Sequence, residues 1–256
     1  MNRKIHTAFP KAAIRFQNEF LDFQKGIRVG RLEDEQRITR ILKLALEAHY
    51  QEEFVTERFG RGVYWQWIGF VFKANRSSKP LSSKSSFGCS KFFLMIDLGE
   101  QLFKCGFSVE RGMITPPSPE FPQAQLLQPD WDWHRLLDGL THRSPLETEL
   151  KRLVDVEGFS IDAGNWEARY NVPRKFPGAE ELKKVLATAP HDTWAMFQVY
   201  YPMREKDIRA STGVDLVDAM IAVFIETASA MDLCMQVQLP NEGLGMNNDP
   251  QDIYNV

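Results

Sequence analysis

The residues best suited to chemistry form a positively charged window over positions 58–91 that contains no Asp or Glu. The window holds seven Lys and Arg residues, in a chain whose net charge is −3. Aromatic residues, including Trp65 and Trp67, lie in the same window. Cations attract phosphate groups and flat rings can stack on bases, so this composition indicates binding of nucleic acid or another polyanion. The expected contacts are Arg61, Lys73, Arg76, Lys79, Lys84 and Lys91.

The aromatic residues of this window also suit the core of a strand. Over 64–74 aromatic and β-branched residues dominate, and apolar side chains fall on both faces. Under this interpretation Trp65 and Trp67 pack inside the protein and do not stack on a ligand. The cations of the loop over 76–84, together with its serines and backbone amides, then remain as the expected ligand contacts.

Carboxylates near the window suggest a second hypothesis, a metal-dependent phosphodiesterase or nuclease. Asp97 and Glu110 would hold Mg²⁺, the only cofactor that the sequence suggests, and Lys104 would lie on the same face of the sheet. Such an ion activates water and neutralises phosphate charge. The pattern is incomplete, because Arg111 and Gly112 follow Glu110 and no Lys stands two positions after it.

The sequence lacks the residue patterns of other catalytic, metal-binding and cofactor-binding sites. The cysteines Cys89, Cys105 and Cys234 are far apart in the sequence, and no C-x-x-C pair is present. His49 and Glu53 share one helix face at a spacing of four, but a third metal ligand is missing. No G-x-S-x-G elbow or dinucleotide fingerprint occurs. We therefore expect no resident metal or organic cofactor, and we favour a protein that is not an enzyme.

Length and composition indicate a domain with a packed core. The chain has 256 residues, of which 43% are hydrophobic and 25% are charged. The first residues do not resemble a signal peptide, because His6, Pro10 and Lys11 interrupt the apolar stretch that one requires. The apolar stretches are all far shorter than the roughly 18 residues of a membrane-spanning helix. These patterns favour a soluble, cytoplasmic protein without membrane contacts.

The elements expected to position the window are two N-terminal helices and a three-strand meander. Apolar residues recur at helical spacing over 11–24 and again over 33–55. The meander covers about 63–111 and begins with the strand over 64–74. A polar, serine-rich segment over 76–86 reads as a mobile loop between the first two strands.

The last two strands of the meander can be paired residue by residue. If Gly99 and Glu100 form a two-residue type II′ turn, three apolar pairs face one another on the core side. These pairs are Ile96 with Phe103, Leu94 with Cys105, and Phe92 with Phe107. The opposite face carries the mixed set of Phe93, Met95 and Asp97 against Gly106, Lys104 and Leu102. We expect that mixed face to be only partly covered.

The second half of the chain follows a proline-rich connector over 113–130. Ser144, Pro145 and Glu147 form a capping box, which predicts a helix from Pro145 to about residue 156. Pro202 is expected to end the last strand. The other predicted elements are strands over 159–162, 166–172 and 194–201 and helices over 179–187 and 214–235.

Together these patterns predict an α+β fold with a mainly antiparallel sheet. The chain is expected to form a single domain, either as one unit or as lobes over 1–115 and 130–239, with a loose tail over 240–256. The leading functional hypothesis is a non-enzymatic binding protein or assembly subunit that contacts nucleic acid or another polyanion. The alternatives are the phosphodiesterase and a protein-interaction subunit that binds an acidic partner or a second copy of itself.

Overall fold

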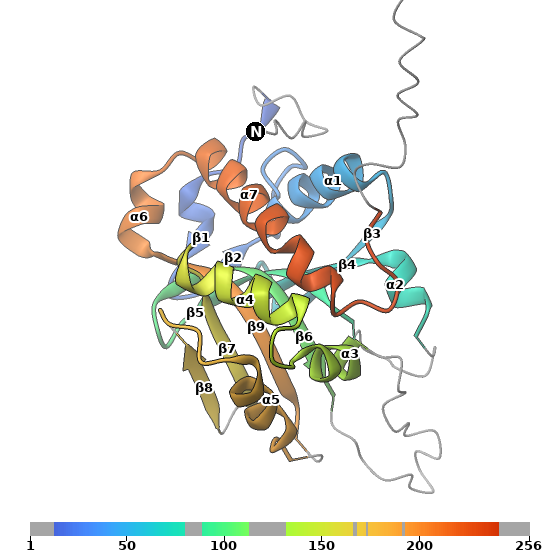
Figure 1. Cartoon of the computed structure of the whole chain (residues 1–256). Helices are drawn as coiled ribbons and strands as arrows, with labels where there is room; N and C mark the ends of the chain where they lie inside the picture. Colours follow the sequence, from blue (N-terminus) through green and yellow to red (C-terminus); the bar gives the residue numbers. More distant parts are fainter. Residues whose placement is uncertain are drawn as a thin grey trace, which may run out of the picture.

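The computed structural model describes residues 13–79, 89–112, 132–165, 168–172, 174–190 and 193–240. These residues form helices that cover one face of an antiparallel sheet (Figure 1). The strands are β1 (Leu21–Asp22), β2 (Gly26–Arg28), β3 (Phe54–Arg61), β4 (Tyr64–Phe72), β5 (Lys91–Asp97), β6 (Leu102–Arg111), β7 (Ser160–Asn165), β8 (Arg169–Val172) and β9 (Ala195–Arg204). The helices are α1 (Ile38–Tyr50), α2 (Lys73–Ser77), α3 (Asp132–Gly139), α4 (Pro145–Asp155), α5 (Ala179–Ala187), α6 (Glu205–Ala210) and α7 (Gly213–Asp232). The predicted α+β class is confirmed.

One sheet runs through both halves of the chain. Its order is β1-β2-β4-β5-β6-β9-β7-β8, β3 pairs with the free side of β4, and neighbouring strands are antiparallel. The ladder between β6 and β9 runs from the pair Leu102–Arg204 to the pair Arg111–Ala195. Because β6 precedes the 113–130 connector and β9 follows it, this ladder joins the two halves. β3 and β8 lie at opposite edges of the sheet.

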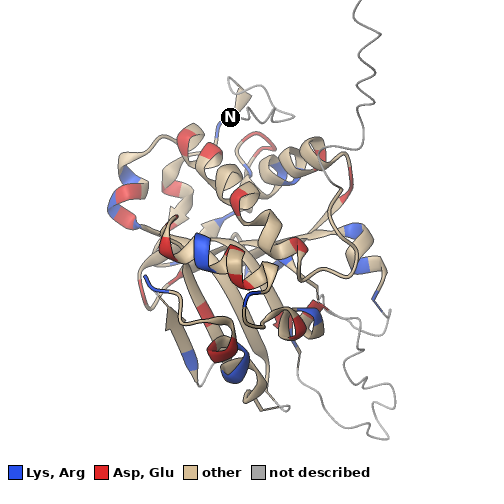
Figure 2. Cartoon of the chain, in the orientation of Figure 1, with Lys and Arg blue, Asp and Glu red and all other residues tan. Residues whose placement is uncertain are grey.

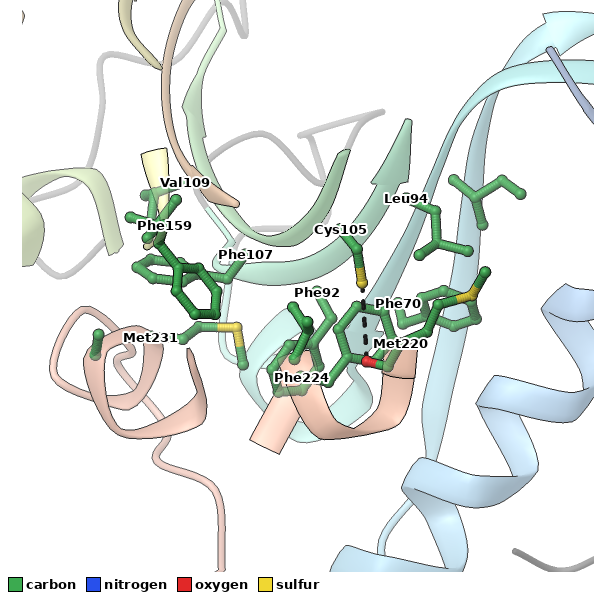
Figure 3. Packing of buried hydrophobic residues seen from close by; sticks show 14 of the residues in the cluster. Phe70, Phe92, Leu94, Cys105, Phe107, Val109, Phe159, Met220, Phe224 and Met231 are labelled. Atoms are coloured by element: carbon green, nitrogen blue, oxygen red, sulfur yellow. Dashed lines mark hydrogen bonds between the residues drawn. The ribbon is translucent and has the colours of Figure 1, made fainter. Parts of the chain in front are cut away.

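The helix-covered face of the sheet carries the hydrophobic core. Phe224 of α7 stacks on Phe92 of β5 with ring centroids 4.9 Å apart and lies 5.7 Å from the ring of Phe70 (Figure 3). Cys105 of β6 points toward the same helix, where its thiol donates to the carbonyl oxygen of Met220. The sulfur-bearing and aromatic side chains predicted for the core face of the β5–β6 hairpin are therefore buried.

The opposite face of the sheet is the inside of a curl, and we call it the concave face. Arg169 of β8 contacts Asp97 at the end of β5, although β6, β9 and β7 lie between these strands. A flat sheet would separate strands four positions apart by about 19 Å, so the sheet must bend strongly. Gly69 and Gly106 flank Phe93 in the register. A Cβ at Gly106 would lie 1.9 Å from a carbonyl oxygen of β9, so only glycine fits there.

The predicted helix over 11–24 is wrong. In the described part of this segment Asn18–Phe20 form a 3₁₀ turn and the next two residues form strand β1. Arg209 donates to the carbonyl oxygens of Asn18 and Leu21 at 2.8 and 3.1 Å. Contacts with a distant part of the chain therefore satisfy backbone groups that a helix would pair internally.

The helix predicted over 33–55 is shorter than expected. α1 ends where Gln51 takes a left-handed conformation with a φ of 55°. The chain then forms β3, which was not predicted because most of its side chains are exposed and give no apolar alternation. This strand carries two of the cations of the window, Arg58 and Arg61.

The register predicted for β5 and β6 is confirmed for every pair, whereas the predicted turn is wrong. The loop holds four residues, 98–101, and its left-handed residue is Gln101, with a φ of 54°. Asp97 Oδ1 accepts the backbone N–H groups of Gly99 and Glu100 at 3.1 and 3.0 Å. Hydrogen bonds from the turn to the Asp97 side chain therefore hold this loop, and Gly99 does not take the left-handed conformation that the prediction required.

In the second half α4 and α5 follow their predictions closely and α7 ends three residues early, whereas α3 and α6 are not among the predicted elements. α4 begins at Pro145, and the hydroxyl of Ser144 accepts the N–H of Glu147 at 3.0 Å. α5 has the predicted bounds. β9 continues through Pro202, against expectation. Beyond Tyr200 only β6 pairs with β9, so a residue without an N–H fits the open side of the strand.

Parts of three predictions lie outside the described residues. These are the connector over 113–130, the loop beyond residue 79 and the tail after residue 240. In the described residues the predicted boundary between strand and loop is wrong. The strand predicted over 64–74 ends at Phe72, and the chain then forms the short helix α2 before any loop.

Candidate functional site

Lys79, one of the expected phosphate contacts, lies inside the protein. Its Nζ donates to Oδ1 of Asp132 at 2.7 Å and to Oε1 of Gln236 at 2.9 Å. The other oxygen of Asp132 accepts the side-chain amide of Asn75 at 2.7 Å and the N–H of Ser90 at 2.5 Å. These bonds join α2, α3, the start of β5 and the segment after α7. We therefore assign Lys79 a structural role.

Lys91 is also buried, on the concave face. Its Nζ lies 3.0 Å from a carboxylate oxygen of Glu110, 3.8 Å from one of Glu57, and 5.5 Å from the ring centroid of Trp67. Burial alone would lower the pKa of Lys91, but the two carboxylates outweigh it and raise the pKa. This lysine is charged and already neutralised. Lys84 lies outside the described residues.

The other expected contacts are exposed. Lys73 forms an ion pair with Glu53, and Nε of Arg76 lies 3.7 Å from a carboxylate oxygen of Glu57. Arg61 is exposed at the end of β3 and makes no ion pair with any residue that the structure describes. Of the expected contacts, Arg61 is therefore the one whose charge the described part of the chain leaves uncompensated.

Arg58, on the same strand, belongs to the window but was not among the expected contacts. Its guanidinium carbon lies 4.3 Å from the ring centroid of Trp65, a distance typical of stacking. It is exposed and, within the described ranges, no carboxylate pairs with it. Stacking holds the guanidinium plane while its N–H groups stay free to bind an anion.

A β-bulge lies in the hairpin that carries both arginines. Phe59 pairs with Trp67, whereas the next residue, Gly60, pairs with Trp65, so Gln66 is left without a partner across the ladder. The extra residue reverses the alternation of β4. Trp65 accordingly packs against the hydrophobic core, whereas Trp67 lies on the concave side.

The bulge places two cross-strand pairs on one face of the hairpin. Phe59 lies opposite Trp67, and Arg61 lies opposite Tyr64. A further cation, Lys25, lies 5.6 Å from the ring centroid of Tyr64. We call the four paired residues the hairpin patch: Phe59, Arg61, Tyr64 and Trp67.

A second charged cluster lies on the concave face, where β8 curls toward the β5–β6 turn. Nζ of Lys104 lies 3.0 Å from Asp97, 2.8 Å from Glu100 and 3.0 Å from Asp162. Nη2 of Arg169 lies 3.2, 2.5 and 2.7 Å from the same three carboxylates. We call these five residues the concave network. Two cations in it face three carboxylates.

Hydrogen bonds complete the buried part of the concave network. Lys104 and Asp162 are fully buried. Oδ1 of Asp162 accepts the side-chain amide of Asn171 at 2.6 Å and the hydroxyl of Tyr200 at 3.3 Å. Burial, followed by the charge of Asp162, raises the pKa of Tyr200 to about 12, so its hydroxyl stays a donor. Burial would lower the pKa of Lys104, but Asp162 and its other partners raise it.

The candidate metal ligands do not converge. Lys104 and Asp97 are in contact, but Glu110 binds Lys91 at the other end of β5. Asp97 and Lys91 bound this seven-residue strand, so they are about 20 Å apart. Within the described ranges, no group of three or more His, Cys, Asp or Glu residues could hold a metal ion.

Sequence reasoning missed two members of the concave network, Asp162 and Arg169, and the two residues that donate hydrogen bonds to Asp162, Asn171 and Tyr200. Asp162 lies between Ile161 and Ala163 of β7, which both belong to the core cluster, so alternation alone puts its carboxylate on the other face. That signal was available in the sequence. The contacts of Arg169 and Tyr200 with Asp162 were not, because they depend on how β7 pairs with β8 and β9.

Comparison with known proteins does not assign a family. No helix of the described residues is long and apolar enough to cross a membrane. The three cysteines are buried and free. No family model, curated protein or solved structure matches the chain. Its function therefore has to be argued from the hairpin patch and the concave network.

Proposed function

We propose that this is a non-enzymatic binding protein that holds a polyanion at the β3–β4 hairpin. The observation that supports this most strongly is a difference in pairing among the cations of the window. Arg58 and Arg61 form no ion pair with a described residue. The other described cations of the window each contact a carboxylate: Lys73, Arg76, Lys79 and Lys91.

The position of the two arginines suits an external anion. Both lie on β3, which is an edge strand, so no neighbouring strand competes for the space beside them. A planar guanidinium binds phosphate or sulfate through two parallel N–H bonds. The nearby helix α2 carries positive residues and no negative ones (Figure 2). Since Glu53 and Glu57 balance that helix, the excess positive charge at this edge comes from Arg58 and Arg61.

Binding of two fluorescein-labelled polyanions, heparin and a 15-nucleotide oligothymidine, tests the proposal in the full chain. We expect the double variant Arg58→Ala/Arg61→Ala to bind both about ten-fold more weakly, because two phosphate or sulfate contacts are lost. The slope of log affinity against log salt concentration should fall by roughly 0.7–0.9 for each lost contact. Fluorescence anisotropy over a salt series measures both quantities.

A matched control is available at the opposite edge of the sheet. Arg174 and Lys175 are exposed and follow β8, so Arg174→Ala/Lys175→Ala removes the same charge far from the hairpin. This control should retain the affinity of the wild type. Equal losses in both double variants would mean that net charge alone drives binding, and no loss in the hairpin variant would remove the proposal.

The alternatives have less support. The phosphodiesterase needs converging carboxylates, but Asp97 and Glu110 bind different lysines. An acidic protein could use the same edge strand and the same arginines. A partner that co-purifies with the wild type after nuclease treatment, and is lost in Arg58→Ala/Arg61→Ala, would favour that alternative.

A further inference from the structure

The aromatic residues of the hairpin patch indicate which class of polyanion binds there. Phe59 is 65% exposed, and Trp67 directly opposite is only partly buried. A single exposed ring is common on protein surfaces and would carry no conclusion. Phe59, however, forms a cross-strand aromatic pair with Trp67. This pair lies at the same edge of the sheet as Arg58 and Arg61, which form no ion pair with a described residue.

Rings and cations follow one another along this face of the hairpin. The pair of Arg61 and Tyr64 comes next after the pair of Phe59 and Trp67. Residues two apart on a strand are about 7 Å apart, so the two pairs form one continuous surface. Lys25 extends it beyond the ring of Tyr64, although Asp22 at 3.1 Å offsets part of its charge.

We infer that the ligand of the hairpin patch is single-stranded nucleic acid, an inference that rests on the polyanion binding proposed above. Unpaired bases present flat faces that stack on aromatic side chains such as Phe59, while the adjoining phosphates meet Arg61. A duplex keeps the faces of its bases inside the stack. Sulfated polysaccharides and acidic peptides bring negative charge without bases. Of these polyanions, only a single strand uses both kinds of side chain.

The test compares three ligands with one variant that removes the ring and keeps the charge. Phe59→Ala should weaken binding of a 15-nucleotide oligothymidine and of a 15-nucleotide oligouridine about 5- to 150-fold, the range for losing one stacked base. Binding of heparin, which has no bases, should stay within two-fold of the wild type. Phe59→Tyr should retain the affinity for both oligonucleotides.

Val156 provides a matched control, since it is an exposed apolar side chain at the end of α4, and Val156→Ala should change no affinity. If Phe59→Ala leaves oligonucleotide binding unchanged, or weakens heparin equally, base stacking is overturned while the polyanion proposal stands. If the wild type binds none of the three ligands, both proposals fail. Circular dichroism of Phe59→Ala separates a binding effect from misfolding.

Discussion

The concave network and the β3–β4 hairpin both carry cations, but in opposite environments. In the network, the fully buried Lys104 contacts three carboxylates, and Arg169 contacts the same three. At the hairpin, Arg58 and Arg61 are exposed and no described carboxylate pairs with either. A cation that the fold has already neutralised stabilises structure, whereas one left unpaired in water remains free for a ligand.

The network also explains how the sheet holds its curl. Asp97 and Glu100 lie at the β5–β6 turn, and Arg169 lies on β8 at the far edge of the sheet. Their ion pairs close the concave face across the strands between them. The hairpin patch spans no such gap, because Phe59 and Arg61 lie on the edge strand β3, which pairs only with β4 among the described strands, and Tyr64 and Trp67 lie on β4 itself.

The largest expected effect is on stability, when Lys104 is removed. Lys104→Met leaves three carboxylates facing Arg169 alone, two of them buried, and should lower the free energy of unfolding by about 3–5 kcal/mol. Urea unfolding followed by tryptophan fluorescence measures the loss. The double variant Lys104→Met/Asp162→Asn should recover part of it, because one unpaired charge is gone. A loss below about 1 kcal/mol would show that the network does not hold the curl.

A smaller effect concerns pH and the carboxylate of Asp97. Burial raises its pKa, but the N–H of Glu100 and the charge of Lys104 outweigh burial, so the pKa lies below its ordinary value of 3.8. A carboxyl group with a lowered pKa stabilises the folded state above that ordinary value, and the contribution is lost as pH falls through the folded-state value. Asp97→Asn should therefore be less stable than the wild type at pH 7.

The difference between Asp97→Asn and the wild type should shrink as the pH falls below about 4, since protonation of Asp97 then removes from the wild type the charge that the variant already lacks. Urea midpoints at pH 7 and pH 3 give the comparison. A constant difference at both values would assign the effect of the substitution to lost hydrogen bonds with the turn, and not to charge.

The smallest expected effect on stability is at the hairpin. Arg58→Ala/Arg61→Ala should change the free energy of unfolding by less than about 0.5 kcal/mol, because both side chains are exposed and lack carboxylate partners in the described ranges. The same urea experiment measures it. A large loss would mean that the stacking of Arg58 on Trp65 supports the fold, and the contrast between the two regions would weaken.

Local sequence patterns predicted the parts of the fold that depend on near neighbours. Alternation of apolar residues was enough for the register of β5 with β6, and the cap at Ser144 was enough for the start of α4. The same alternation put Lys104 and Asp97 on one face of the sheet. These features depend on chain geometry over a few residues, so the sequence expresses them directly.

The sequence by itself determined the α+β class, most strands and helices, and the presence of an acid-free basic window. Only the tertiary structure decided which of those cations are neutralised. Lys79 meets Asp132 and Lys91 meets Glu110, partners 53 and 19 residues away, because α3 and β6 pack beside them. The sequence shows where each charged residue lies along the chain, but not which distant carboxylate will lie beside it in the fold. A buried lysine needs such a partner, because an unpaired charge inside a protein is strongly destabilising.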